Sequence, residues 1–180
     1  RRVLLSSIRG AAVTSIKIEG VTHEFSSIPG VIEDVTEIIL NIKQLALKLN
    51  DVESTKIQIN SKGPKEIKAG DIDCGAHVEV LNKDLHICTL DSKANVNITL
   101  TVEEGKGYVP AVKHNNSGDA PLGTIFIDSF FSPVRRVSFR VENSRVGQVT
   151  DYDKLIMNIE TNGSVVPEDS VAFAARIIDE

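Results

Sequence analysis

Two cysteines and two histidines supply the residue types that ligate metals or act as nucleophiles. Cys74 and His77 are close in sequence, and His86 and Cys88 are two positions apart on a predicted strand, where alternate side chains share a face. Together the four residues could ligate zinc or serve a small enzyme. A structural zinc site takes about four ligands, and the turn between the two pairs gives no standard spacing. We therefore interpret them as ordinary strand residues and keep a metal- or substrate-binding enzyme as the alternative.

The nearby carboxylates and glycines do not form a recognised catalytic pattern. Asp71, Asp73 and Glu79 lack the dense oxygen-ligand spacing of a calcium loop, which favours ordinary surface charges. The segment Gly105–Gly107 surrounds a lysine but lacks the full glycine pattern, the Ser or Thr and the helix of a phosphate-binding loop. The sequence therefore predicts no catalytic, cofactor-binding or metal-binding residue.

The other two histidines fit ordinary surface roles. His23 precedes Glu24 after a predicted hairpin, and we expect it to hydrogen-bond within the turn rather than act as a general base. His114 lies in residues 113–120, the most polar and turn-rich stretch of the chain. That composition predicts an exposed loop and a solvated histidine.

Charge and hydropathy argue against two classes of function. The 180 residues carry 20 Lys and Arg against 25 Asp and Glu, which gives a net charge of −5. A protein that grips nucleic acid alone needs a basic surplus, because phosphate neutralisation dominates such binding, so we expect DNA contact only through partners. No apolar run approaches the roughly 18 residues that span a bilayer, and no signal peptide is visible. A cytoplasmic protein with two free thiols is expected.

The clearest helical pattern covers residues 31–49. Apolar side chains repeat there at spacings of three and four, as on the buried face of a helix. Glu33 and Asp34 are expected in the first turn, and Lys43 and Lys48 lie toward the end, which matches the helix dipole.

Shorter helices are predicted at the two ends of the chain. Residues 3–8 form an apolar helical turn that Gly10 is expected to end. Residues 167–180 begin with a proline at an early helical position and two acidic residues, although Val166 stands where a capping side chain is common. Both helices look incomplete at their outer ends, so truncated termini are expected.

Between the helices the apolar period changes to two, which is typical of half-buried antiparallel strands. Turn signals such as Asn162–Gly163 separate the runs. The predicted strands are centred on residues 16–18, 57–59, 78–80, 96–102, 125–127, 137–141 and 155–159. Composition and periodicity thus predict an α+β chain without a credible active site.

Six sequence blocks occur in a fixed order along the chain. They are Arg-Arg-Val-Leu-Leu-Ser-Ser at 1–7, Gly-Val-Thr-His-Glu-Phe-Ser at 20–26 with Gly-Val-Ile-Glu-Asp-Val at 30–35, Gly-Tyr-Val-Pro-Ala at 107–111, Ser-Pro-Val-Arg-Arg at 132–136, Thr-Asp-Tyr-Asp-Lys-Leu at 150–155, and Thr-Asn-Gly with Pro-Glu over 161–168. In this order they resemble the amino-terminal domain of the bacterial DNA-directed RNA polymerase alpha subunit. The resemblance covers essentially the whole chain.

The resemblance implies an α+β fold in two subdomains. Residues 1–9 and 135–180 would form a dimerisation subdomain, an antiparallel sheet plus helices. Residues 10–134 would form an inserted, mostly antiparallel β subdomain that carries one long helix and contacts the large polymerase subunits.

The implied function is that of an assembly scaffold in DNA-templated transcription. The family forms a homodimer on which the beta and then the beta-prime subunits assemble. It has no active site of its own, although it belongs to a nucleotidyltransferase complex. The resemblance implies no cofactor, no metal and no membrane partner.

Four residues match family positions that contact the large subunits. Arg2 and Leu5 match positions needed mainly for beta, and Lys43 and Ile127 match positions implicated mainly in beta-prime. The residues themselves leave ordinary roles open: a solvated Arg2, a Lys43 that complements the helix dipole, and an Ile127 in the core.

Overall fold

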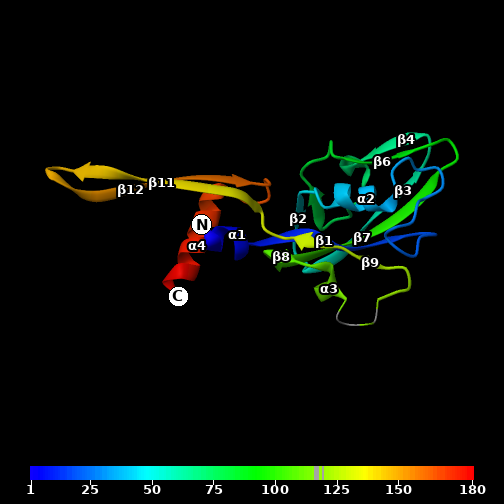
Figure 1. Cartoon of the computed structure of the whole chain (residues 1–180), viewed down its shortest axis with the longest axis horizontal. Coiled ribbons are helices and arrows are strands. Elements are labelled where there is room, and N and C mark those ends of the chain that lie inside the picture. Colours follow the sequence, from blue (N-terminus) through cyan, green and yellow to red (C-terminus); the bar gives the residue numbers. More distant parts are fainter. Residues whose placement is uncertain (116–117, 119) are drawn as a thin grey trace.

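Alternating apolar residues build the largest element of the fold, a six-stranded antiparallel sheet. The computed structural model describes residues 1–115, 118 and 120–180, and this sheet fills the right-hand part of Figure 1. The strand order is β3-β7-β1-β2-β5, with β9 added against β1. The strands are β1 (Arg9–Ile18), β2 (Leu47–Leu49), β3 (Ser54–Lys62), β5 (Val78–Val80), β7 (Asn95–Lys106) and β9 (Ile125–Phe126).

Isoleucines line up across the three long strands. Ile98 of β7 lies opposite both Ile18 of β1 and Ile59 of β3, and all three side chains are at most 2 % exposed. Because side chains alternate along a strand, this register puts every second residue on the buried face. The strands that alternation predicted in this sheet are confirmed.

One helix and a short hairpin complete this core. Helix α2 (Val35–Ile42) buries its apolar side against the sheet and lies against β6 (His86–Leu90). Strand β6 pairs with β4 (Lys65–Lys68), which leads into the 3-10 turn η1 (Ala69–Asp71). The helix side chains in the core are Val35, Ile38, Ile39 and Ile42.

The predicted helix over residues 31–49 is wrong at both ends. The observed helix begins after Asp34, whose Oδ1 accepts a hydrogen bond from the Glu37 backbone N–H at 2.9 Å. Glu33 therefore lies outside the first turn. The helix ends at Ile42 with Lys43 as its C-terminal cap, and of the apolar residues that follow, Leu47 and Leu49 belong to β2.

A contact distant in sequence explains the early end. The Asn82 side chain donates to the Gln44 carbonyl oxygen and accepts from the Ala46 N–H, both at 2.8 Å. These bonds satisfy backbone groups that a continuing helix would have used. Lys48, expected near the helix end, lies in β2 instead.

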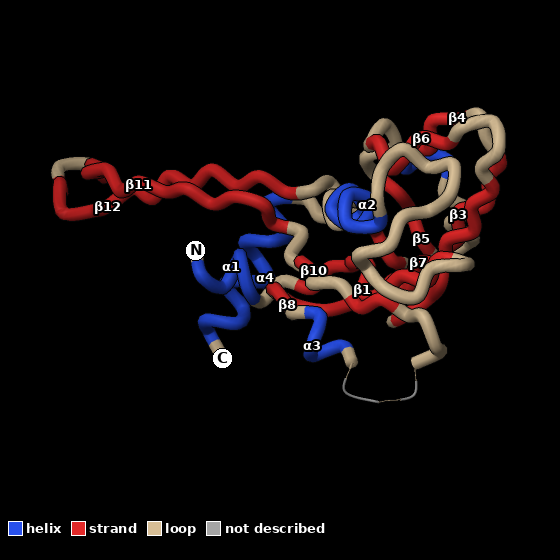
Figure 2. Tube along the Cα trace, turned by 45° about the vertical axis from the view of Figure 1, so that its right-hand side comes forward, coloured by secondary structure: helices blue, strands red, loops and turns tan. Residues whose placement is uncertain are grey.

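A second, smaller core lies at the other end of the molecule. Strands β11 (Val134–Val146) and β12 (Val149–Thr161) form a long hairpin that extends away from the main sheet (Figures 1 and 2). Helices α1 (Arg2–Ser6) and α4 (Pro167–Asp179) lie beside its base. Leu4, Val134, Val137 and Ala174 are the buried residues of this core. The predicted terminal helices and the last two predicted strands are confirmed.

Between the two cores the chain forms a small two-stranded sheet and a short helix. Strand β8 (Tyr108–Val109) pairs with β10 (Ser129–Phe130), and α3 (Ala111–His114) follows β8. The exposed loop predicted over residues 113–120 therefore starts later than expected. Residues 116, 117 and 119 of that loop lie outside the described residues.

Gly10 does not end the first helix as predicted, because it lies inside β1. A Cβ at this position would be 1.9 Å from the carbonyl oxygen of Phe131. The glycine is therefore required by the close approach of two backbones and not by a turn.

The α+β class predicted from the sequence is confirmed. Among the helices of residues 1–115, 118 and 120–180, none combines the length and the apolar character that crossing a membrane requires.

Candidate functional site

Lys43 and Asp128 form the centre of one candidate contact surface. Lys43 is the C-terminal cap of α2, and its Nζ lies 3.8 Å from Oδ2 of Asp128. The Lys43 side chain is 34 % exposed and the Asp128 side chain is 41 % exposed. The pair is therefore accessible to solvent and contributes little to the stability of the fold. The ion pair places one charge of each sign side by side at the surface.

Asp128 is held by more than Lys43. Its Oδ1 accepts a hydrogen bond from the Ala111 backbone N–H at 2.7 Å, at the start of α3. This bond and a hydrogen bond from Tyr108 lower the pKa of the Asp128 carboxyl, and the same contact raises the pKa of the Tyr108 phenol. The carboxylate is therefore ionised and fixed between α2, β8 and α3.

Ile127 positions this carboxylate from inside the core. Its side chain is 3 % exposed and belongs to the main hydrophobic cluster, and its N–H donates to the Thr14 carbonyl oxygen at 3.1 Å. Of the two roles left open by the sequence, the side chain has the core one. It lies beside Asp128 in sequence, so the structure brings the predicted residues Lys43 and Ile127 into one region.

Arg2 and Leu5 lie in a different region, on α1. The Arg2 side chain is exposed, and its carbonyl oxygen accepts a hydrogen bond from Ser6 Oγ at 2.7 Å. Leu5 is partly buried against the small core, in which Leu4 is the fully buried residue of the helix. The sequence identified Arg2 and Leu5 but not Leu4, whose buried side chain holds α1, and with it both residues, against the small core.

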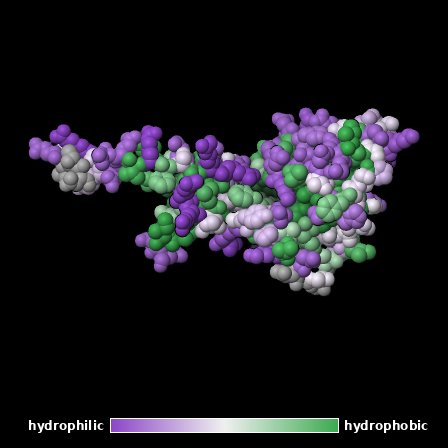
Figure 3. Space-filling view, viewed as in Figure 1, coloured by the Kyte–Doolittle hydropathy of each residue, from purple (hydrophilic) through white to green (hydrophobic). Residues whose placement is uncertain are grey.

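An apolar groove opens beside α1. Its volume is about 300 Å³, and its walls come from α1, the hairpin and α4. Ile178, Leu155 and Phe139 are 74 %, 59 % and 55 % exposed, which is unusual for large apolar side chains. Figure 3 shows apolar residues (green) gathered around α4 and along the hairpin next to it. The lining residues are Arg1, Val3, Leu4, Phe139, Leu155, Met157, Val171, Ala174, Ala175 and Ile178.

The four residues of the enzyme alternative do not come together. Cys88 is fully buried, and burial raises the pKa of its thiol to about 12. Cys74 donates weakly to the Ile72 carbonyl oxygen, and His77 Nδ1 lies 3.1 Å from the Asn50 carbonyl oxygen. Burial also raises the pKa of Cys74. Neither thiol is activated as a nucleophile, and the described part of the chain contains no group of three or more His, Cys, Asp or Glu side chains that could hold a metal.

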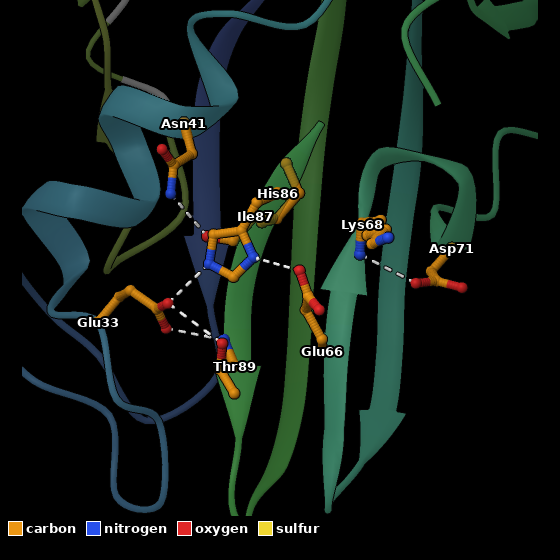
Figure 4. Close-up of polar contacts among 8 residues, drawn as sticks. All are labelled: Glu33, Asn41, Glu66, Lys68, Asp71, His86, Ile87 and Thr89. Carbon is orange, nitrogen blue, oxygen red and sulfur yellow. Dashed lines mark hydrogen bonds and ion pairs between the residues drawn. The ribbon is translucent and has the colours of Figure 1, made fainter. Parts of the chain in front are cut away.

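His86 instead joins two carboxylates on different elements (Figure 4). Its Nε2 lies 2.7 Å from Glu33 Oε1, just before α2, and its Nδ1 lies 3.0 Å from Glu66 Oε1 on β4. Glu33 Oε2 also accepts the Thr89 N–H at 2.7 Å. The sequence did not find this network, because its members are far apart along the chain.

The other two histidines differ in how well they match expectation. His23 lies 3.3 Å from Ser26 Oγ, so the predicted hydrogen bond within the turn is confirmed. His114 was expected to be solvated, which is wrong. Its Nε2 lies 3.1 Å from Ser129 Oγ, and its ring meets the Phe131 ring edge-on at 6.2 Å. These contacts hold α3 against β10 and the segment that follows it.

A comparison with known families identifies a match to this chain. The family model described as the RNA polymerase Rpb3/RpoA insert domain matches residues 16–132, which is more than half of the chain. This segment contains α2, the Lys43–Asp128 pair and the main sheet apart from residues 9–15 of β1. It does not include α1, α4 or the apolar groove.

Proposed function

Since this chain belongs to the RNA polymerase Rpb3/RpoA insert-domain family, that of the amino-terminal domain of the polymerase alpha subunit, we propose that it is a non-catalytic scaffold on which the polymerase is assembled. The match over residues 16–132 is the observation that carries the proposal. It makes the chain a subunit of DNA-directed RNA polymerase with a role in transcription. Dimerisation and the docking of particular subunits are the finer parts of the proposal.

The two hydrophobic cores support a division of the chain into two subdomains. All buried residues of the main core lie between Ala11 and Ile127, whereas those of the small core lie at Leu4, Val134, Val137 and Ala174. This partition supports a dimerisation subdomain of residues 1–9 and 135–180 and an inserted subdomain of residues 10–134, except that Val134, at the proposed boundary, packs in the small core.

The apolar groove supports homodimerisation of the outer subdomain. The groove has a volume of about 300 Å³ and is lined by large exposed apolar side chains. Exposure of this apolar surface to water is unfavourable in free energy. A second copy offers the same side chains, so a two-fold arrangement would let each copy cover the groove of the other. Ile178, near the end of α4, is the most exposed apolar side chain of the groove.

The two charged surfaces support docking of the large subunits. Arg2, exposed on α1 next to Leu5, provides a guanidinium that can bind a carboxylate through two parallel hydrogen bonds. We assign this surface to the beta subunit. The Lys43–Asp128 pair, positioned by Ile127, presents one charge of each sign and is assigned to beta-prime.

Ile178→Asp tests dimerisation. The substitution places a carboxylate in the groove, and burial of an unpaired charge at an interface is strongly unfavourable. We expect light scattering coupled to size exclusion to give a dimer for the parent chain and a monomer for the variant. Ala172→Asp, which adds the same charge to an exposed site of α4 outside the groove, should remain dimeric. A monomeric parent chain, or a dimeric Ile178→Asp variant, would refute this part of the proposal.

A further inference from the structure

Helix α2 is fastened to β6 at both of its ends (Figure 4). Before the helix, Glu33 accepts hydrogen bonds from the Thr89 N–H at 2.7 Å and from Thr89 Oγ1 at 3.3 Å, in addition to its contact with His86. At the other end, Asn41 Nδ2 donates to the Ile87 carbonyl oxygen at 2.9 Å. In addition to its apolar packing, α2 is therefore attached to β6 by polar contacts at three residues of that strand: His86, Ile87 and Thr89.

One of these attachments depends on a proton. A neutral imidazole has one N–H donor and one acceptor nitrogen, so it cannot donate to two carboxylates at once. His86 has a carboxylate oxygen within 3.0 Å of each ring nitrogen, Glu33 on one side and Glu66 on the other. Only the imidazolium donates to both. Loss of the proton leaves a nitrogen lone pair facing a carboxylate oxygen.

The other charged groups around His86 do not replace this bridge. Lys68 is the ladder partner of His86 on β4, and its backbone N–H is bonded to Asp71. Cys88, two positions along β6, has a neutral thiol because burial raises its pKa. On α2, Asp34 caps the helix and Glu37 is exposed. Glu33 and Glu66 are thus the groups bonded to the ring.

We propose that His86 is a proton-dependent clamp that holds the start of α2 to the β4–β6 hairpin and thereby sets the position of Lys43 at the end of the helix. In the protonated state the clamp is closed and links Glu33, β6 and β4. In the neutral state the ring keeps one N–H donor and loses its hydrogen bond to one of the two carboxylates, so it no longer links Glu33 to β4. This inference deepens the proposed function, on which the role of Lys43 rests.

The direction of the pH dependence follows from the contacts. The hydrogen bond to Glu33, more than the one to Glu66, raises the pKa of His86 above its ordinary value. The closed clamp is therefore complete at and below the ordinary pKa of histidine and is lost as pH rises through the raised pKa. For Glu33, burial acts to raise the pKa, but the bonds from Thr89 and His86 outweigh it and the pKa is lowered. Acid opens the clamp only when pH falls through this lowered value.

The titration of His86 and the exchange of α2 amides test the clamp in the isolated chain. Nitrogen-detected NMR should give a titration of His86 that lies above the ordinary value of histidine. Protection factors of the α2 amides, corrected for the intrinsic pH dependence of exchange, should fall about tenfold or more as pH rises through the His86 titration. An ordinary titration for His86, or protection that does not change with pH, would overturn the proposal.

Three variants separate the clamp from a general loss of stability. His86→Gln cannot be charged, so protection of α2 should be low and independent of pH over this range. Glu66→Gln removes one carboxylate, so the pKa of His86 should fall toward its ordinary value while the Glu33 contact persists. His77→Gln, which removes a histidine bonded only to a loop carbonyl, should retain the parent pH profile. A flat profile for the parent chain and for Glu66→Gln alike would also contradict the clamp.

Binding measurements distinguish the clamp from the function on which it rests. If capture of purified beta-prime weakens at high pH for the parent chain and is pH-independent for His86→Gln, the clamp regulates docking. If the NMR and exchange results hold but beta-prime does not bind at any pH, the clamp stands and the proposed docking role of Lys43 is wrong.

Discussion

Asp128 gives Lys43 and Ile127 a common structural role at the scale of single residues. Ile127 is buried in the main core, whereas Lys43 is at the surface on another element. The carboxylate between them is bonded to the Ala111 N–H and paired with Lys43. A substitution at either predicted position would therefore disturb the same surface charge.

Arg2→Ala and Lys43→Glu should affect different partners, which makes each the control for the other. Loss of the Arg2 guanidinium should weaken capture of purified beta by about thirtyfold or more, since truncation of a charged contact costs about 2 kcal/mol or more. Lys43→Glu sets a second carboxylate beside Asp128 and should weaken capture of beta-prime. Pull-down titrations of each variant against both subunits measure this. Equal loss for both partners would mean that neither surface is selective.

The sequence predicted the role of a histidine correctly where its hydrogen-bond partner was near in the chain and incorrectly where the partner was distant. His23 bonds to Ser26, three positions away, as predicted. His86 bonds to Glu33 and Glu66, and His114 to Ser129, and none of these pairs has a spacing that the sequence marks. A side-chain network between elements depends on how the chain folds back, which single-sequence patterns do not contain.

At the scale of elements, α2 is defined by its caps rather than by its apolar spacing. The apolar pattern continues to residue 49, yet the helix ends at Ile42 because Asn82 bonds to Gln44 and Ala46. Strands were predicted better, because alternation directly reports a face buried against the core. The register of β7 between β1 and β3 confirms this.

Asp34→Ala should destabilise the chain by about 1 kcal/mol, the usual cost of losing a helix N-cap. The side chain of Asp34 accepts the Glu37 N–H at 2.9 Å, and Ala cannot replace that acceptor. Urea unfolding monitored by circular dichroism measures the loss. Asp34→Asn keeps an acceptor and should cost only a few tenths of that amount, so equal losses for both variants would contradict the capping role.

At the scale of the whole molecule, the chain contains two hydrophobic cores of unequal size. The main core draws on the sheet, α2 and β6, whereas the small core has four buried residues packed between α1, α4 and the hairpin. A core of this size supplies little stabilisation by itself. We therefore expect the small core to depend on coverage of the apolar groove more than the main core does.

Leu4→Ala should destabilise the outer subdomain selectively. Leu4 is 3 % exposed in the small core, and truncation of a buried leucine costs about 2–5 kcal/mol. Hydrogen exchange should accelerate in α4 and at the base of the hairpin, with β7 amides unchanged. Leu122→Ala, the same deletion at a side chain that is 94 % exposed, is the control. Uniform acceleration in both subdomains would mean that the two cores unfold as one unit.

The close approach of Gly10 to Phe131 has a mechanical consequence. The chain passes between the two cores twice, once at the start of β1 and once after β10, and these crossings are in backbone contact. The Phe131 N–H donates to the Gly107 carbonyl oxygen at 2.8 Å, and the Asn162 N–H donates to the Pro133 carbonyl oxygen at 2.8 Å. Two adjacent covalent connections resist twisting about the line that joins the cores but permit bending across it. We therefore expect relative motion of the two cores to be bending across this line rather than twisting about it.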